Sequence, residues 1–358
     1  MNILHITDIA NSKGNGVAVA VNDYLKYENV ENNVAVYNLD SLIGNEKIQK
    51  FSFSEYKKLS SLPEPFNKPD IVVFNEVYKI KYLKIARECK KNNIKYVIIP
   101  HGCLTNFSRK MKRSRLKKFI ALNFVLKNFI KNASAIQYLN EYEKNETKIC
   151  NNKSIISGNG IDLSLCKDNR FVNKNLIYIG RYNIYHKGLD IIIEVCKKYR
   201  KWFLECNVVI ELYGRDSNNN QMLLKELIEK NKLTNIVKLN DPVYGDEKAK
   251  LLCESYAFIQ TSRFEGQPMG ILEALGNGLP CILTSGTSFA EYVNNNQCGL
   301  GSNFDVDEIF KNIKNMYENE ELRNKMSVNA KQSIRRDFLW EDVIKNCVNQ
   351  YKKIQNEK

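Results

Sequence analysis

Residues 257–276 read AFIQTSRFEGQPMGILEALG, and three patterns follow one another in this stretch. The apolar run at 257–260 has the length of a buried strand, a loop of small and polar residues follows it, and residues 270–277 have helical periodicity. A strand that leads through a loop into a helix is half of a βαβ unit, in which the helix crosses over to a parallel strand. The stretch therefore indicates a parallel sheet covered by helices.

The same alternation continues in both directions. Strands are predicted at residues 3–6, 34–37, 71–74, 96–99, 135–138, 176–179, 208–212, 236–239, 257–260 and 281–283. Helices are predicted at residues 17–26, 79–90, 112–131, 140–148, 188–202, 219–230, 246–254, 270–277 and 340–353. Right-handed helical crossovers are the usual connection between parallel strands. We therefore expect an α/β protein with two Rossmann-like, doubly wound domains that face one another across a cleft.

The domain boundary is predicted within residues 157–175, a stretch that contains two glycines and several Asn and Asp residues. The expected division is an N-terminal domain at 1–160, a C-terminal domain at 161–338, and a last helix at 339–358. Ligands of open α/β sheets bind at the carboxyl ends of the strands. The chemistry is therefore expected in the loops that follow strands.

The chain has 358 residues and a formal net charge of +14. The excess lies in one half, because residues 1–160 hold 26 Lys and Arg against 14 Asp and Glu, and the remainder holds 28 against 26. Charged residues at 26% and hydrophobic residues at 43% exclude a disordered or collagen-like chain. Ten scattered cysteines without zinc-ligand spacing indicate structural thiols in a reducing cytoplasm. We expect no signal peptide and no membrane-spanning segment.

Two cations follow the first strand of the second half. Gly180 and Arg181 end the predicted strand at 176–179, and Lys187 comes six residues later at the start of a helix. Arginine can bind a phosphate in a bidentate manner and lysine acts as a point charge, so the pair suits a diphosphate. The alternative is a solvated loop with two basic residues.

Glu265 and Glu273 are eight residues apart, on either side of a predicted helix start. Both can reach one extended ligand if Glu265 lies in the loop and Glu273 within the helix. Pro268 fits the first turn, where N–H groups have no intrahelical acceptor, and the amides of residues 268–270 would then point at an anion. Carboxylates for hydroxyl pairs and amides for a diphosphate suit a nucleotide sugar. The alternative is two solvated glutamates beside a helix.

Two further candidates lie in the first half. Gly14 and Gly16 flank Asn15 between the first strand and the first helix, where a backbone without side chains could approach a phosphate. His101 follows the strand at 96–99, and a neutral imidazole there could bond to a sugar hydroxyl or a phosphate. A plain Gly-Asn-Gly turn and a turn histidine without a ligand are the alternatives.

Taken together, these motifs resemble the family 4 retaining glycosyltransferases, which have the glycosyltransferase B fold. The resemblance covers nearly the whole chain, and it includes Asn159-Gly160-Ile161-Asp162. It implies that the N-terminal domain binds the acceptor, that the C-terminal domain binds the nucleotide sugar, and that the last helix crosses back to the N-terminal domain. The resemblance also implies roles for the residues Glu273 (ribose hydroxyls), Glu265 (donor sugar), Arg181 and Lys187 (diphosphate), Gly180, Gly266, Pro268, Met269 and Gly270 (orientation of sugar and phosphate), Gly14 and Gly16 (diphosphate, from the other domain) and His101 (donor sugar and acceptor).

The resemblance further implies a transfer with retention of configuration from a nucleotide-sugar donor, with a UDP-sugar favoured. A hexosyl or N-acetylhexosaminyl group would pass to a glycan or lipid-linked saccharide in cell-surface polysaccharide or glycoconjugate synthesis. A donor phosphate oxygen would accept the proton of the acceptor, so neither a protein base, a metal nor a cofactor is expected. The chain departs from the family pattern at residues 239–242 and lacks the usual double glycine at 285–291, where Glu291 receives no role.

Seven of the ten residues from Arg109 to Lys118 are basic, and an apolar stretch follows at 119–126. This pattern favours a helix that docks on an anionic membrane surface, at about 1 kcal/mol for each Lys or Arg near the lipid. The enzyme is therefore expected in the cytoplasm, peripheral on the inner face of the plasma membrane. The alternative is a solvated face on a core helix.

Two other functions remain open on the sequence. A nucleotide-sugar epimerase or hydrolase would share the fold but lacks the combination of Arg181 and Lys187 with Glu265 and Glu273. A nucleic-acid-binding protein would account for the basic cluster. The basic run carries no nucleic-acid motif and no interleaved aromatic residues, so we expect no nucleic-acid partner.

Overall fold

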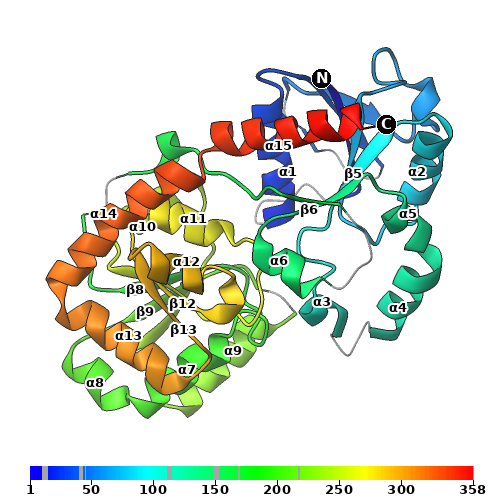
Figure 1. The fold of residues 1–358 in the computed structure, drawn as a ribbon. Helices are drawn as coiled ribbons and strands as arrows, with labels where there is room; N and C mark the ends of the chain where they lie inside the picture. Colours follow the sequence, from blue (N-terminus) through cyan, green and yellow to red (C-terminus); the bar gives the residue numbers. More distant parts are fainter. Residues whose placement is uncertain are drawn as a thin grey trace. The chain divides into compact units, whose positions relative to one another are not determined.

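The computed structural model describes residues 1–9, 15–39, 43–44, 46–110, 115–147, 153–167, 170–216 and 218–357. They form two compact units (Figure 1). The first consists of Met1–Asn159 together with Trp340–Lys358, and the second is Gly160–Leu339.

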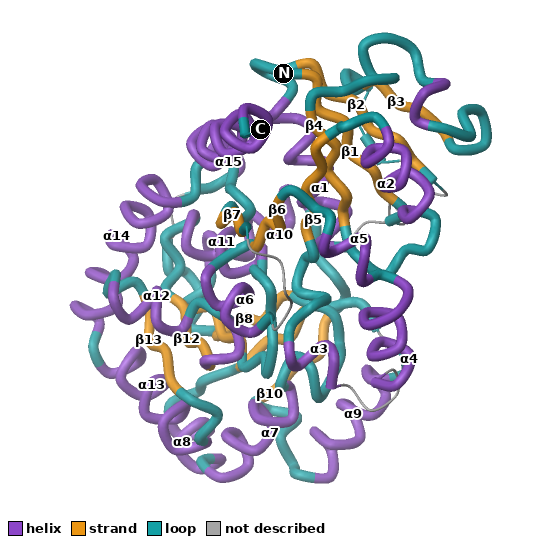
Figure 2. Tube along the Cα trace, turned by 45° about the vertical axis from the view of Figure 1, so that its right-hand side comes forward, coloured by secondary structure: helices purple, strands orange, loops and turns teal. Residues whose placement is uncertain are grey.

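The first unit is built on a parallel sheet whose strand order is β3-β2-β1-β4-β5-β6-β7 in the described residues (Figure 2). Its strands are β1 (Asn2–Thr7), β2 (Asn33–Asn38), β3 (Gln49–Ser52), β4 (Ile71–Asn75), β5 (Lys95–Ile99), β6 (Ala135–Tyr138) and β7 (Ser154–Ile156). Its helices are α1 (Gly16–Glu28), α2 (Tyr82–Lys91), α3 (Asn106–Lys110), α4 (Arg115–Ile120), the π-helical turn Ala121–Val125, α5 (Lys127–Lys131), α6 (Glu141–Glu146) and α15 (Trp340–Asn356).

Helices cover both faces of this sheet, because neighbouring side chains of a strand point to opposite sides. In β1, Leu4 and Ile6 join the core on the side of α2 and α5. Ile3 joins the other core, which contains α1 and α15. Most side chains of the central strands are apolar and buried on both faces, as expected for a parallel sheet that is covered on both sides.

The second unit repeats the design with the strand order β10-β9-β8-β11-β12-β13 in its described residues. Its strands are β8 (Leu176–Ile179), β9 (Ile210–Tyr213), β10 (Val237–Asn240), β11 (Ala257–Gln260), β12 (Cys281–Thr284) and β13 (Gly299–Ser302). Its helices are α7 (Leu189–Lys198), α8 (Arg200–Glu205), α9 (Asn220–Lys230), α10 (Gly245–Glu254), α11 (Met269–Gly276), α12 (Ala290–Asn295), α13 (Val306–Glu318) and α14 (Glu320–Asp337).

Both sheets change direction of winding at one place, between β1 and β4 in the first unit and between β8 and β11 in the second. Such a switch point leaves room outside the carboxyl ends of the two strands, where ligands of doubly wound sheets bind. The loops after β1, β4, β8 and β11 are therefore the first places to look for a site.

The structure confirms the predicted fold class of two doubly wound α/β domains. The ten predicted strands are present, and three more were missed because they are short or atypical: β3, β7 and β13. The continuous helix predicted at 112–131 is wrong, because α4, a π-helical turn and α5 occupy residues 115–131, and residues 111–114 lie outside the described part. In the described part of the chain, every helix is too short or too polar to cross a bilayer.

Helix α15 packs against α1 in the first unit, as Figure 1 shows. Trp340 makes an edge contact with Tyr24 at 5.2 Å between ring centroids and stacks on Tyr27 at 5.5 Å. Deeper in the core, the amide of Gln137 accepts a hydrogen bond from Tyr351 Oη at 2.6 Å and donates one to Tyr24 Oη at 3.1 Å. The last helix is therefore part of the core of this unit.

Candidate active site

Two loops of the second unit meet at its switch point, the loop after β8 and the loop after β11. Lys187 Nζ lies 2.5 Å from Glu265 Oε1, and both side chains are largely buried. The same oxygen accepts hydrogen bonds from Ser262 Oγ at 2.7 Å and from Gln260 Nε2 at 3.1 Å. The predicted cation and the predicted carboxylate are thus brought together in one buried polar cluster.

Opposing effects act on the pKa of the Glu265 carboxyl. Burial acts to raise it, whereas the charges of Lys187 and His186 and the hydrogen bonds from Lys187 and Ser262 lower it. The favourable interactions prevail, and the pKa lies below its usual range. Glu265 is therefore a carboxylate at neutral pH, able to accept hydrogen bonds from hydroxyl groups.

The backbone around this pair is fixed by close contacts. Gly188 has a φ of +64°, and a Cβ atom there would lie 1.9 Å from the carbonyl oxygen of Thr261. Only glycine fits at such a distance in this conformation. On the outer side, Arg263 binds both carboxylate oxygens of Asp190 at 2.7 Å, and its backbone N–H donates to the carbonyl of His186 at 3.0 Å. The two loops are held together independently of the Lys187–Glu265 pair.

Arg181 lies at the end of β8 and differs from Lys187 in its surroundings. Its side chain is exposed, and it has no hydrogen bond or ion pair to any residue that the structure describes. Gly180 before it is required sterically, because a Cβ atom would lie 2.4 Å from the hydroxyl of Tyr178, which is buried beneath the loop and donates to the Arg181 carbonyl. The guanidinium is thus available to a ligand.

Helix α11 begins at Met269, with Pro268 as its N-cap residue. Our expectation of amide donors at residues 268–270 needs one correction, because proline has no N–H. The donors at this helix start are the N–H groups of Met269 and Gly270, which have no acceptor within the helix. Gly270 approaches the end of β8, since a Cβ atom there would lie 3.5 Å from the carbonyl oxygen of Ile179. Gly266 precedes the helix, and its carbonyl accepts a hydrogen bond from Ser288 Oγ at 3.0 Å.

Glu273 lies within α11, as the spacing predicted, and its carboxylate forms an ion pair with Lys248 of α10. The sequence had given no reason to select Lys248, because it belongs to a helix that carries no motif. His186 was also missed, although it is one of three histidines. Its Nε2 donates to the carbonyl oxygen of Phe264 at 2.8 Å, and burial lowers the pKa of the imidazole.

The first unit holds the remaining candidates, with Gly16 after β1 at its switch point and His101 after the next strand, β5. Gly16 is the first residue of α1, and Asn15 caps this helix by accepting a hydrogen bond from Val17 N at 3.3 Å. A Cβ atom at Gly16 would meet no atom of the described residues within 4 Å, so they impose no steric need for glycine there. Gly14 lies outside the described residues.

His101 follows β5 and occupies the left-handed region with a φ of +50°. Its Nε2 lies 3.2 Å from Asn75 Oδ1 at the end of β4. Burial, with repulsion from His5 in addition, lowers the pKa of His101 to about 3, so the ring is neutral at physiological pH.

A buried glutamate supports the His101 turn. Glu143 Oε1 accepts from Gly102 N at 2.5 Å, and its Oε2 accepts from Leu139 N at 2.7 Å. Burial raises the pKa of this carboxyl to about 7. The Asn140-x-x-Glu143 pattern at the start of α6 is typical of a capping box, but Glu143 bonds to neighbouring loops in place of the N-cap amide. The sequence pattern therefore predicts the cap of α6, but it does not predict the hydrogen bond from Gly102 N to Glu143 that supports the turn at His101.

Residues 168–333 match the family model described as glycosyl transferases group 1. The match covers most of the second unit, and the two doubly wound domains have the glycosyltransferase B fold, as the sequence motifs indicated. Within the described residues, no group of three His, Cys, Asp or Glu side chains is placed to hold a metal ion.

Solved structures resemble the chain over its full length. The sucrose-phosphate synthase of Thermosynechococcus elongatus has a TM-score of 0.77 at 12% identity, over 99% of this chain and 98% of that one. HepE from Anabaena, in complex with UDP and glucose, has a TM-score of 0.75 at 16% identity, over 99% and 100%. WaaG, a glycosyltransferase involved in lipopolysaccharide biosynthesis, has a TM-score of 0.67 at 14% identity, over 99% and 100%. A comparison with curated proteins finds no match.

Proposed function

We propose that this glycosyltransferase moves a hexosyl or N-acetylhexosaminyl group, with retention of configuration, from a UDP-sugar to a glycan or lipid-linked saccharide. The observation that carries the proposal is the Lys187–Glu265 pair beside the start of α11, at the switch point of the second unit. HepE, which binds UDP-glucose, and WaaG, which acts in lipopolysaccharide biosynthesis, have the same fold and favour this substrate class.

Each group of the site has a role in this proposal. Arg181, Lys187 and the N–H groups of Met269 and Gly270 bind the diphosphate, Glu265 binds the donor sugar, and Glu273 binds the ribose hydroxyls. The Gly14–Gly16 loop and His101 belong to the first unit, to which we assign the acceptor. Hydroxyl groups donate hydrogen bonds to carboxylates, and phosphate oxygens accept them from amides and cations, so the residue types fit the ligand.

The reaction needs stabilisation of a leaving group. As the bond between the anomeric carbon and the phosphate oxygen breaks, negative charge grows on the nucleoside diphosphate, and Arg181 and Lys187 oppose it. The acceptor oxygen forms the new bond on the same face, and its proton passes to a donor phosphate oxygen. His101 contacts the amide of Asn75.

A panel of nucleotide sugars tests the donor. We expect UDP-sugars to raise the unfolding temperature more than GDP- or ADP-sugars, because a ligand at 100 times its Kd stabilises by about 2.7 kcal/mol. The panel is run in EDTA, since side chains supply the positive charge in the proposal. The product formed with the best donor and a glycan acceptor is then examined by NMR, and we expect it to keep the donor's anomeric configuration.

Two results would contradict the donor proposal. If none of the nucleotide sugars stabilised the protein, the proposed donor class would be wrong. A product of inverted configuration would show that the reaction is not retaining. Loss of binding in EDTA that added Mg²⁺ restores would show that a metal is required after all.

The segment from α4 to α5 supports the expected docking on an anionic membrane surface. Leu122, Leu126 and Phe129 are buried in the core. On the outer side, Leu116 is 71% exposed, Phe119 56% and Phe124 75%, beside the exposed Arg115 and Lys117. We propose that these apolar side chains enter the lipid interface while the basic ones meet the headgroups.

Lys118 does not belong to this exposed set. Its Nζ donates to the carbonyl and the hydroxyl of Ser108 at 2.8 and 2.9 Å and lies over the ring of Tyr78. Burial lowers the pKa of this amine. Of the basic residues between Arg109 and Lys118, we therefore assign the docking role to Arg115 and Lys117, and residues 111–114 lie outside the described part.

Vesicle co-sedimentation tests the docking. We expect the Arg115→Glu/Lys117→Glu variant to bind vesicles of anionic phospholipid at least about tenfold more weakly than the unchanged chain, since each cation contributes about 1 kcal/mol. The matched control is Lys352→Glu/Lys353→Glu on the exposed side of α15, which alters net charge by the same amount. Equal losses in both variants would mean that overall charge, not this segment, governs binding.

A further inference from the structure

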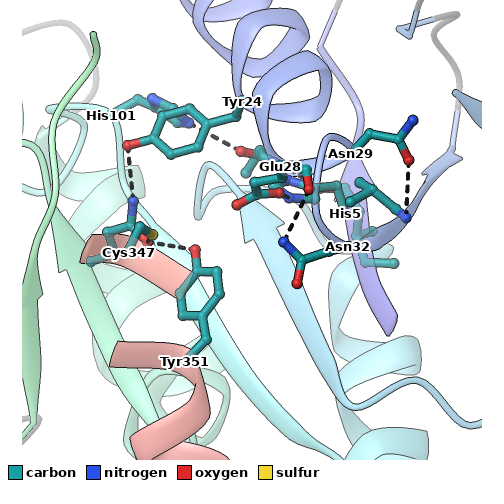
Figure 3. A network of polar contacts seen from close by, with 12 residues as sticks. His5, Tyr24, Glu28, Asn29, Asn32, His101, Cys347 and Tyr351 are labelled. Carbon is teal, nitrogen blue, oxygen red and sulfur yellow. Dashed lines mark hydrogen bonds and ion pairs between the residues drawn. The ribbon is translucent and has the colours of Figure 1, made fainter. Parts of the chain in front are cut away.

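A chain of hydrogen-bonded side chains leads from the interior of the first unit to His101. Glu28 Oε2 lies 2.7 Å from His5 Nε2, and His5 Nδ1 lies 3.2 Å from Asn75 Nδ2. Asn75 Oδ1 then lies 3.2 Å from His101 Nε2. Glu28, His5 and Asn75 are buried, with at most 1% exposed, whereas His101 is partly exposed. Figure 3 labels Glu28, His5 and His101 of this network.

The hydrogen-bonding groups permit one consistent assignment of protons. An amide oxygen only accepts, so His101 Nε2 carries a hydrogen. The Asn75 amide nitrogen only donates, so His5 Nδ1 is the unprotonated ring nitrogen and His5 Nε2–H donates to Glu28. Asn75 Nδ2 also lies 3.4 Å from the carbonyl oxygen of Ile6, which fixes the amide in this orientation.

Backbone pairing and further hydrogen bonds hold this side-chain network in place. Thr7 and Asn75 end the two strands of the switch point, and His5 is in register with Val73 on β4. Tyr82 Oη donates to the Asn75 carbonyl at 2.6 Å, and Glu143 holds Gly102 beside His101. Buried polar groups of this kind add little stability compared with apolar residues of the same shape. The network therefore calls for another role.

We propose that Glu28, His5 and Asn75 are positioning residues that hold His101 as the neutral Nε2–H tautomer, so that its Nδ1 serves as a hydrogen-bond acceptor for a sugar hydroxyl. The proposal rests on the proposed function, in which His101 contacts the donor sugar or the acceptor. A hydroxyl group can donate to an unprotonated ring nitrogen, whereas a protonated Nδ1 would repel it. The three residues act through His101 and do not touch the substrate.

Nitrogen NMR of ring-labelled histidine at pH 7 reads the tautomers directly, and the chain has three histidines to assign. In the unchanged protein we expect His101 and His5 each to show a protonated Nε2 and an unprotonated Nδ1. In the Asn75→Asp variant, a carboxylate oxygen faces His5 Nδ1 in place of a donor, so we expect the ring-nitrogen signals of His5 to change. The carboxylate still accepts from His101 Nε2–H, but its negative charge favours a proton on His101 Nδ1, which removes the acceptor for a sugar hydroxyl. Transfer is therefore expected to lose at least tenfold in kcat with little change in KM for the nucleotide sugar.

The matched control is Asn38→Asp, which places the same new carboxylate at the end of β2 in the same sheet. Asn38 bonds to the backbone of Ile43, and it contacts none of the three histidines. We expect the control to leave the histidine spectrum and kcat unchanged. If Asn75→Asp does not fold, Glu28→Met removes the acceptor at the other end, and we expect a mixture of His101 tautomers and a lower kcat.

The outcomes separate the two proposals. A protonated Nδ1 on His101 in the unchanged protein would overturn the positioning proposal, and so would an Asn75→Asp variant that matches its control in spectrum and kcat. Absence of transfer by the unchanged protein with every nucleotide sugar would overturn the proposed function alone. The NMR result does not need activity and still decides whether the network fixes the tautomer.

Discussion

The Lys187→Ala variant is expected to lose at least a hundredfold in the rate of sugar transfer while its fold survives. In the proposed reaction Lys187 faces charge that grows on the leaving diphosphate, and removal of one such preorganised group typically costs about 10²–10³ in kcat. Lys187 also neutralises Glu265, whose carboxylate lies 2.5 Å away. The change therefore affects both the diphosphate and the sugar.

The fold is expected to tolerate this loss. Glu265 keeps its hydrogen bonds from Ser262 and Gln260, and the loops remain tied by Arg263 and Asp190. Loss of one partner of a fully buried pair costs about 3–5 kcal/mol. We expect a smaller cost, since both side chains retain some exposure. Thermal unfolding followed by circular dichroism measures it.

Two further variants complete the test. Glu265→Gln removes the other charge of the pair, and we expect it also to abolish transfer. Lys198→Ala is the matched control, because Lys198 forms an exposed ion pair with Asp307 in the same unit. Initial rates are measured with saturating acceptor. Full turnover by Lys187→Ala or Glu265→Gln would show that the nucleotide sugar binds elsewhere.

The second large effect is expected from removal of α15. A chain that ends at Leu339 should lose the cooperative unfolding of the first unit. The helix buries six apolar side chains in that unit: Trp340, Ile344, Cys347, Val348, Tyr351 and Ile354. At about 1.5–3 kcal/mol each, they contribute about 10 kcal/mol or more, which is comparable with the whole stability of a domain, about 5–15 kcal/mol.

Hydrogen exchange measures this loss for each unit separately. We expect amides of β1, β4 and β6 to lose protection in the shortened chain, whereas those of β8 and β11 keep it. A peptide of residues 340–358 added in excess serves as the control, because it should restore protection if the missing helix is the cause. Unchanged protection in β1 would mean that the first unit is stable without α15.

The sequence predicts most strands and helices because their signals are local. A parallel sheet buried on both faces needs continuous apolar runs, and these are visible in β1, β4, β8 and β11. β13 has the sequence GLGS, which has low strand propensity. Gly299 leaves room for the backbone of Cys281 on β12, and this close approach of the two backbones explains the glycine in the strand. β3 has the sequence QKFS with a single apolar residue, and β7 has only three residues, so neither gives a strand pattern.

Some residues of the candidate site could likewise be predicted from local spacing, and others could not. Glu265, Pro268 and Glu273 lie within nine residues, so their spacing alone identified them. Lys187 and Glu265 meet only because β8 and β11 are neighbours in the sheet, which local patterns do not show. The contacts among Glu28, His5 and Asn75 join three separate elements, and no spacing rule reveals them.

The two segments that connect the units have a consequence for how the protein is synthesised. Ile161 N donates to the carbonyl oxygen of Phe338 at 2.8 Å, and Ile161 pairs with Leu339, so the second unit begins and ends at adjacent points. It is an insertion between β7 and α15 of the first unit. On the ribosome, α15 emerges after all of the second unit. The inserted unit can therefore complete its fold first, while the unit that begins the chain must wait for the last helix.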